Sequence, residues 1–122
     1  MIKTILVVES DSTVRSLVRY SLAYLNYEIM DAGSREDAFE KLNNEKKPDL
    51  IITGSLTSLS NPVELVREIR NLPGLRFVPI LMMAAVDTLG AQMEWKEAGA
   101  TCWITRPFRQ EELVEMVELL FF

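Results

Sequence analysis

The stretch "ILVVESDSTVRSLVRYSLAYLN", residues 5–26, contains the pattern of one strand followed by one helix. Ile5 to Val8 is an unbroken apolar run, which is typical of a strand buried on both faces. Asp11 or Ser12 is expected to cap the helix, and Asn26 is expected to end it in a left-handed conformation. The apolar residues of the helix recur at helical spacing: Val14, Leu17, Val18, Leu22 and Leu25.

The same alternation recurs along the rest of the chain. Further short apolar runs predict strands at residues 27–32, 50–53, 78–83 and 101–104. Helical patterns follow them, with starts expected near Ser34, Asn61, Asp87 and Gln110. Continuous apolar strands that alternate with helices predict a parallel sheet covered on both faces. The sequence therefore predicts one α/β domain over residues 1–122.

Composition excludes several classes of function. A net charge of −5 over 122 residues argues against non-specific nucleic-acid binding by this chain. The chain has no histidine, which removes the commonest general base and metal ligand. A single cysteine, Cys102, excludes an internal disulfide and is expected to be an inert core thiol. No apolar run is long enough to span a membrane and no leader pattern is present, so we expect a cytoplasmic protein.

Functional residues are expected at the carboxyl ends of the strands, where ligands bind in open parallel sheets. The chain brings these residues there: Glu9, Ser10 and Asp11; Thr53, Gly54 and Ser55; Ala84 and Ala85; Thr105, Arg106 and Pro107. Gly54 itself is interpreted as a turn glycine, chosen for its freedom in φ. The set holds carboxylates and one guanidinium but no activated nucleophile.

Four segments, "ILVVESDSTVR", "PDLIIT", "VPILMMAA" and "AGATCWITRPF", resemble in this order the receiver domain of two-component response regulators, of the CheY-like chemotaxis type. The spacing of Gly99, Trp103 and the run Arg106-Pro107-Phe108 is the most specific part of the resemblance. The resemblance covers the chain from Ile5 to the last helix. It implies a flavodoxin-like, doubly wound, three-layer fold with five parallel strands.

The resemblance also identifies the positions that carry phosphorylation chemistry in this family. The two Mg²⁺-binding acids correspond to Glu9 and Ser10, and the phosphoacceptor aspartate corresponds to Gly54. The hydroxyl switch residue corresponds to Ala84 and the lysine to Arg106. None of these positions keeps the usual residue. The resemblance therefore implies a degenerate pseudo-receiver with no enzymatic activity, no metal and no cofactor.

Physical chemistry agrees with this interpretation. Phosphoryl transfer to a protein needs a nucleophilic side chain, and Gly54 has none. Glu9 beside a neutral Ser10 hydroxyl makes a poor magnesium site, because Mg²⁺ requires hard oxygen ligands in octahedral geometry. Arg106 is expected to form an ion pair with Glu9 or Asp11, in the space that metal and phosphate would otherwise fill.

The favoured function is a phosphorylation-independent interaction module whose partner is another signalling protein or an output domain. The resemblance places the contact face on the fourth helix, fifth strand and fifth helix, around Trp95, Trp103, Arg109 and Glu112. One further expectation is a homodimer through the last helix and fifth strand. The apolar ending, residues 119–122, is interpreted as a segment packed under the last helix, a dimer contact or the point where a longer chain was cut.

Two alternatives belong to other classes. In the first, the emptied pocket senses a small molecule, with Arg106 and the backbone N–H groups around Gly54 and Ser55 binding an anion or nucleotide. In the second, the chain is a flavodoxin-like redox enzyme. The second is disfavoured because no phosphate-cradling loop follows the first strand.

Overall fold

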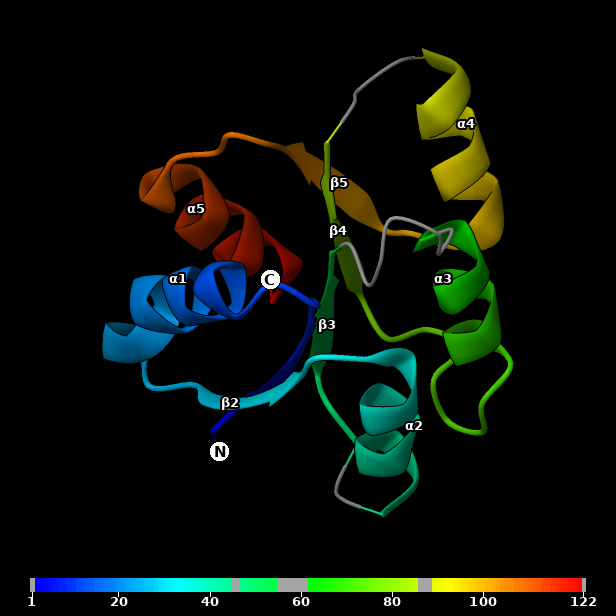
Figure 1. Ribbon diagram of the computed structural model, residues 1–122, viewed down its shortest axis with the longest axis horizontal. Coiled ribbons are helices and arrows are strands. Elements are labelled where there is room, and N and C mark those ends of the chain that lie inside the picture. The colour runs from blue at the N-terminus through cyan, green and yellow to red at the C-terminus, as the bar shows by residue number, and fades with distance from the viewer. Residues whose placement is uncertain (1, 45–46, 55–61, 86–88, 122) are drawn as a thin grey trace.

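Five parallel strands form one sheet in the order β2-β1-β3-β4-β5 in the computed structural model, which describes residues 2–44, 47–54, 62–85 and 89–121 (Figure 1). The strands are β1 (Thr4–Val8), β2 (Glu28–Ala32), β3 (Leu50–Thr53), β4 (Ile80–Ala84) and β5 (Cys102–Thr105). Every neighbouring pair is parallel, so all the carboxyl ends lie at one edge. The predicted doubly wound α/β fold is confirmed.

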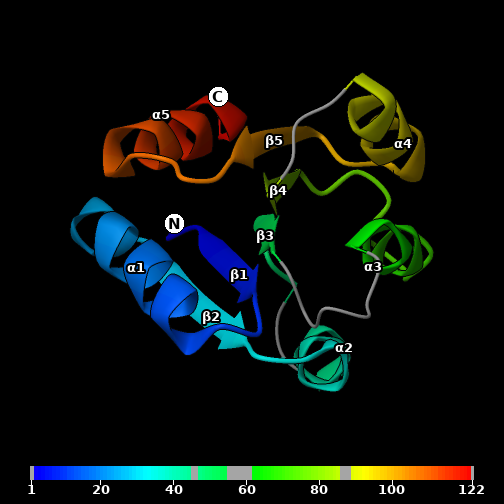
Figure 2. The ribbon, with the colours of Figure 1, turned by 45° about the horizontal axis from the view of Figure 1, so that its top comes forward.

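Helices cover both faces of this sheet (Figure 2). The helices are α1 (Ser12–Leu22), followed by a 3-10 turn η1 (Ala23–Leu25), α2 (Arg35–Asn44), α3 (Pro62–Arg70), α4 (Leu89–Ala98) and α5 (Gln110–Leu120). Helices α1 and α5 lie on one face, and α2, α3 and α4 lie on the other. Side chains alternate between the faces along each strand: Ile5 and Val7 belong to the core under α1 and α5, whereas Leu6 and Val8 belong to the core under α2 to α4.

Local signals placed several element ends correctly. The Asp11 side chain caps α1 by accepting the Thr13 N–H at 2.8 Å. Asn26 has φ 57° and ends the η1 turn as predicted. The Ser34 Oγ accepts the Asp37 N–H at 3.1 Å and so starts α2. The caps predicted at Asn61 and Asp87 lie outside the described residues.

Three strands begin later than predicted, and for β2 the difference is one residue, Glu28 rather than Tyr27. The other two are β4 and β5. Strand β4 starts at Ile80 rather than Val78, because Pro79 has no N–H for a ladder and uses only its carbonyl, which accepts the Ile51 N–H at 3.0 Å. Strand β5 starts at Cys102 rather than Thr101, whose hydroxyl accepts the Ile80 N–H at 2.9 Å. In both cases hydrogen bonding, and not hydrophobicity, sets the first strand residue.

The guanidinium of Arg70 forms hydrogen bonds to the two loops that precede β4 and β5, at the amino ends of these strands. Arg70, the last residue of α3, donates from Nε and Nη2 to the Gly99 carbonyl at 3.0 and 2.7 Å. Its Nη1 donates to the carbonyls of Leu75, at 3.0 Å, and Val78. Desolvation by burial lowers the pKa of Arg70 below its usual value. Gly99, with φ +113°, makes the tight turn that ends α4.

The chain end packs against the start of the sheet. The Phe121 ring lies 5.2 Å from the Tyr27 ring, and the Lys3 ammonium lies 5.8 Å from the Phe121 ring centre. Leu119, in contrast, is 70% exposed. Of the three interpretations of this segment, packing is therefore confirmed for Phe121, while Phe122 lies outside the described residues. Among the described helices, none has the length and apolar character needed to cross a membrane.

Candidate functional site

The carboxyl edge of the sheet brings together the side chains that the sequence placed there. Glu9 follows β1, Gly54 follows β3, Ala84 ends β4, and Arg106 follows β5. Glu9 is only 1% exposed, whereas Ser10 is exposed. Four of the five predicted positions thus converge, and the exposed Ser10 reaches the same carboxylate, since its Oγ donates to Glu9 Oε2 at 3.4 Å.

A buried ion pair occupies the centre of this edge. Arg106 Nη2 donates to Glu9 Oε1, and the two side chains are 29% and 1% exposed. The other carboxylate oxygen of Glu9, Oε2, accepts the Asp11 N–H at 2.9 Å. The predicted ion pair of Arg106 is confirmed with Glu9 as its partner. Asp11 was the other predicted partner, but its carboxylate caps α1 instead.

Gly54 leaves space for neighbouring side chains and does not serve a special backbone conformation. The glycines with left-handed φ in the described part of the chain are Gly74 and Gly99, so the interpretation of Gly54 as a turn glycine that exploits its freedom in φ is wrong. A Cβ added at residue 54 would overlap Glu9 Oε1 and would lie 2.9 Å from both Arg106 Nη2 and Met83 Cε. The ion pair therefore fills the volume that a side chain on β3 would need.

The same atoms do not fit a magnesium ion. Glu9 already binds the Arg106 cation, and Gly54 offers no carboxylate from β3. Over residues 2–44, 47–54, 62–85 and 89–121, no group of three or more His, Cys, Asp or Glu side chains is placed to hold a metal ion. Because Mg²⁺ needs several hard oxygen ligands, this pairing of charges leaves it no suitable set.

Residue 84 supplies backbone but no hydroxyl to the site. The Ala84 carbonyl accepts the Arg106 N–H at 2.8 Å. This hydrogen bond holds the Arg106 backbone beside the end of β4, directly after β5 ends. Its methyl group is 6% exposed and cannot donate or accept a hydrogen bond. An anion at this edge would therefore receive no hydrogen bond from the Ala84 side chain.

Sequence reasoning missed Arg15, which supports the site from α1. Its Nη1 donates to the carbonyls of Glu9 at 2.6 Å and Ser10 at 3.1 Å, and so holds the loop that carries Glu9. A usable signal was present, because a cation in the first turn of a helix opposes the helix dipole and needs another reason to be there.

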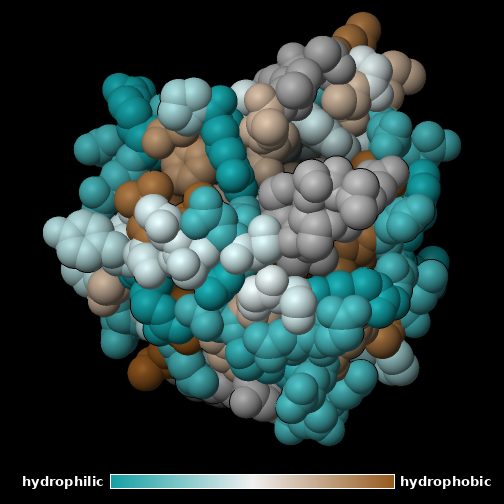
Figure 3. All heavy atoms as spheres, viewed as in Figure 1, coloured by the Kyte–Doolittle hydropathy of each residue, from teal (hydrophilic) through white to brown (hydrophobic). Residues whose placement is uncertain are grey.

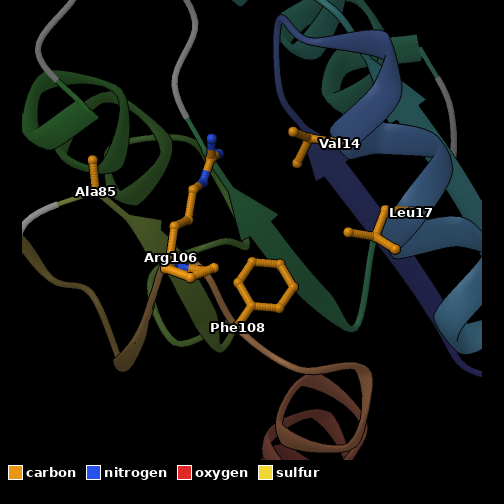
Figure 4. A pocket seen from close by; sticks show the side chains of 6 residues that line it. Val14, Leu17, Ala85, Arg106 and Phe108 are labelled. Carbon is orange, nitrogen blue, oxygen red and sulfur yellow. The ribbon is translucent and has the colours of Figure 1, made fainter.

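A pocket of about 430 Å³ opens beside the ion pair (Figure 4). Val14 and Leu17 of α1 face Arg106 and Phe108 across it, with Ala85 and Pro107 completing the lining. Apart from Arg106, these side chains are apolar. The Gly54 N–H already donates to the Val8 carbonyl at 2.7 Å, and Arg106 is paired with Glu9, so the anion or nucleotide site considered above gains no support. Ser55 lies outside the described residues.

The expected contact face combines surface residues with a buried one. Trp103 on β5 is half-buried, and its ring lies 5.5 Å from that of Trp95 on α4, at an angle of 61°. Trp95 is only 7% exposed, because it packs into the core under α2 to α4. The structure therefore places Trp95 behind the face as a support for Trp103 and not on the surface.

Arg109 and Glu112 form the start of α5. The Arg109 N–H and Nε donate to Glu112 Oε1 at 3.2 and 3.1 Å, which caps the helix. These side-chain and backbone hydrogen bonds lower the pKa of the Glu112 carboxyl. Both residues are solvent-accessible, so they serve the helix start while remaining available on the surface.

A groove of about 370 Å³ runs between the edge strand β5 and α5. It is lined by Trp103, Ile104, Thr105, Glu112, Glu115, Met116 and Leu119. Apolar side chains form part of its wall, and the two glutamates provide its negative charge. On the face shown in Figure 3, hydrophilic residues predominate, with apolar residues gathered over α1 and α5 at the left and over α4 at the top.

The single thiol does not contribute to this edge. Cys102, at the start of β5, packs against the core under α1 and α5. Burial raises the pKa of the Cys102 thiol from 9.0 to about 11, so it stays protonated at neutral pH. This agrees with the prediction of an inert thiol.

Comparison with known proteins identifies the family. A family model described as the response regulator receiver domain matches residues 5–118. The chain is 32% identical to the alkaline phosphatase synthesis transcriptional regulatory protein PhoP of Bacillus subtilis, over 98% of this chain and 49% of that protein. It is 27% identical to the chemotaxis protein CheY1 of Helicobacter pylori, over 95% of this chain and 94% of that protein.

Solved structures agree with the sequence matches. The chemotaxis response regulator CheY4 of Vibrio cholerae has a TM-score of 0.90 against this chain at 26% identity, with 98% of this chain and 99% of that one covered. The chain spans about half the length of the transcriptional regulators named PhoB and PhoP that it matches. Sequence and fold therefore agree that the chain belongs to the response regulator receiver family, whose members are signalling modules that act on other signalling proteins or output domains.

Proposed function

We propose that residues 1–122 act as one receiver-like domain that signals by protein–protein contact, without phosphorylation of an aspartate. One observation carries this proposal: the phosphoacceptor position is Gly54, and the Glu9 carboxylate occupies the space beside it. A reaction that needs a nucleophile at this position has none, and the Glu9 carboxylate, the one group of the pair that could bind Mg²⁺, is instead paired with the Arg106 cation. In this proposal the fold serves as a docking surface.

The contact face is proposed to comprise α4, β5 and α5, with Trp103, Arg109 and Glu112 at its surface. Trp103 supports this choice because large aromatic side chains are enriched at the energetic centres of interfaces, and here Trp95 holds the ring from behind. The partner is proposed to be another signalling protein or an output domain.

The test is phosphorylation with small donors and with a kinase. The purified chain is incubated with Mg²⁺ and acetyl phosphate, or with a phosphorylated histidine kinase, and its intact mass is measured. A phosphorylatable receiver treated in parallel shows that the donors are active. We expect no added phosphoryl group on this chain. A stoichiometric phosphoprotein, whether acid-labile or acid-stable, would overturn the proposal.

Magnesium binding provides an independent measurement. We expect calorimetry to detect no Mg²⁺ binding at millimolar concentration, because the Glu9 carboxylate is buried against Arg106. Specific binding that disappears in the Glu9→Gln variant would show that the ion pair opens for the metal, and it would count directly against the proposal.

A further inference from the structure

The loop between α3 and β4 presents an aromatic ring to solvent on a fixed backbone. Phe77 is 87% exposed, while Leu75, two residues earlier, is 2% exposed and anchors the loop in the core. The Arg70 guanidinium binds the carbonyls of Leu75 and Val78, on either side of Phe77. A large apolar side chain held outward by a fastened loop is suited to insertion into another protein.

Positive charge accompanies this ring. The guanidinium carbon of Arg76 lies 5.5 Å from the Phe77 ring centre, and Lys47 is joined to the same loop through the Pro73 carbonyl. Among the described residues that line the hollow beside Phe77, the acid is Asp49, and its Oδ2 accepts the Thr4 N–H at 2.8 Å. The matching surface would therefore be an apolar hollow with carboxylates around it.

The chain carries such a hollow itself. The groove between β5 and α5, about 370 Å³ in volume, has Trp103, Met116 and Leu119 among its lining residues. Glu115 supplies negative charge along the same groove, whereas the charge of Glu112 is balanced by Arg109, whose Nε lies 3.1 Å from Glu112 Oε1. Both glutamates lie on α5, which carries four glutamates and no basic residue between Gln110 and Leu120. The ring and the groove thus match in polarity and have opposite charges.

The two features lie on different sides of the molecule. The loop that follows α3 is at the lower right in Figure 1, and α5 is at the upper left. Phe77 therefore cannot reach the groove of its own copy.

We propose that Phe77 of one copy inserts into the β5–α5 groove of a second copy, with Arg76 placed against Glu115. The contact is heterologous, because each copy uses one surface as donor and a different one as acceptor, so it builds open rows or rings and not symmetric dimers. It differs from a symmetric dimer through the last helix and fifth strand. The groove overlaps the proposed contact face, but the self-association does not depend on whether the domain is phosphorylated.

Sedimentation velocity on the full chain tests the proposal. For the wild-type chain we expect the weight-average sedimentation coefficient to rise over roughly 10 µM to 1 mM without a plateau at the dimer, and to fall when salt is added. Phe77→Ser and Glu115→Lys should each remain monomeric. Tyr20→Ser is the matched control, since Tyr20 is a 72% exposed aromatic residue on α1, and it should associate like the wild type.

Mixing the two variants separates this contact from other arrangements. Phe77→Ser keeps an intact groove and Glu115→Lys keeps an intact ring, so an equimolar mixture should form dimers that cannot grow further. Circular dichroism and thermal melting confirm that each variant is folded. A wild-type chain that stays monomeric throughout the concentration range would overturn the proposal. So would association that survives Phe77→Ser, or a mixture that remains monomeric. The phosphorylation test of the proposed function is unaffected by any of these results.

Discussion

The carboxylate of Glu9 and any side chain at residue 54 compete for the same space at the carboxyl edge of the sheet. We expect Gly54→Ala to lower the free energy of unfolding by about 2 kcal/mol, because its methyl group would overlap the buried Glu9 Oε1. Urea denaturation measures this change.

A matched glycine supplies the control for that substitution. Gly90, on α4, has open space where a Cβ would be added. Gly90→Ala should therefore cost no packing, and because it lies in a helix it should leave the unfolding free energy unchanged or raise it by up to about 1 kcal/mol. Equal losses for the two variants would show that space beside Glu9 is not what residue 54 must preserve.

The Glu9–Arg106 pair gives a second prediction for single residues. Arg106→Met leaves a carboxylate that is 1% exposed without its cation, and we expect it to lower the unfolding free energy by about 3 kcal/mol. Glu9→Met combined with Arg106→Met removes both charges and should recover most of that loss. Urea denaturation of the four proteins completes a double-mutant cycle. Additive losses would mean that the two side chains do not stabilise each other.

The raised pKa of the Cys102 thiol leads to a prediction about how stability depends on pH. Burial raises the pKa of its thiol in the folded chain from 9.0 to about 11, so the folded state holds the proton more tightly than the unfolded state does. The associated stability is complete below pH 9 and is lost as the pH rises to about 11. Cys102→Ala should show a shallower decline over this window in urea denaturation. The raised pKa of Tyr27 acts equally in both proteins.

At the scale of elements, the bounds of a strand or helix could be predicted from the sequence where its hydrophobic pattern alone determines them. Strand β3 and helix α5 have the predicted bounds, because an unbroken apolar run and a long amphipathic pattern each favour one structure. The starts of β4 and β5 depend on hydrogen bonds between residues far apart in the chain, such as Ile80 to Thr101. Periodicity along one segment carries no information about such partners.

The candidate site, too, could be predicted in part from the sequence. The strand ends placed Glu9 and Arg106 at one edge, and opposite charges in a partly buried space predicted their pairing. The requirement for glycine at residue 54 came from the direction of the Glu9 side chain, which no local pattern specifies. The burial of Trp95 likewise depends on how α4 rotates against the sheet.

Arg70 provides a prediction at the scale of elements, since it joins the end of α3 to the loops before β4 and β5. Arg70→Met removes the bonds to Gly99, Leu75 and Val78, and should lower the unfolding free energy by about 2 kcal/mol. Hydrogen exchange should accelerate in both loops. Arg67, an exposed residue on the same helix, is the control, and Arg67→Met should stay within about 0.5 kcal/mol of the wild type.

At the scale of the whole molecule, the chain has the layers and the strand order of the receiver fold. A TM-score of 0.90 against a chemotaxis regulator shows that the layers and strand order match that structure over nearly the full chain. The core consists of apolar residues on the strands and inner helix faces, and of the five positions that the resemblance assigns to phosphorylation it includes Ala84 alone. The apolar core and the residues of the candidate site are therefore largely separate sets.

This separation predicts that the family's usual residues can be installed together. A chain with Glu9→Asp, Ser10→Asp, Gly54→Asp, Ala84→Thr and Arg106→Lys should gain Mg²⁺-dependent labelling by acetyl phosphate, detected as one added phosphoryl group by intact mass. Gly54→Asp alone should not be labelled, because its side chain would meet the Glu9–Arg106 pair. Labelling of Gly54→Asp alone would show that the Glu9 and Arg106 side chains move aside easily. A folded variant with all five substitutions that is not labelled would mean that other positions also prevent the reaction.

The shared space of residues 9 and 54 also sets an order for substitutions at this edge. An acid introduced at residue 54 while Glu9 and Arg106 stay in place meets both of their side chains, so these must move before the new carboxylate fits. Shortening residue 9 first, as in Glu9→Asp, provides that space before residue 54 needs it. A series of single substitutions should therefore change residue 9 before residue 54.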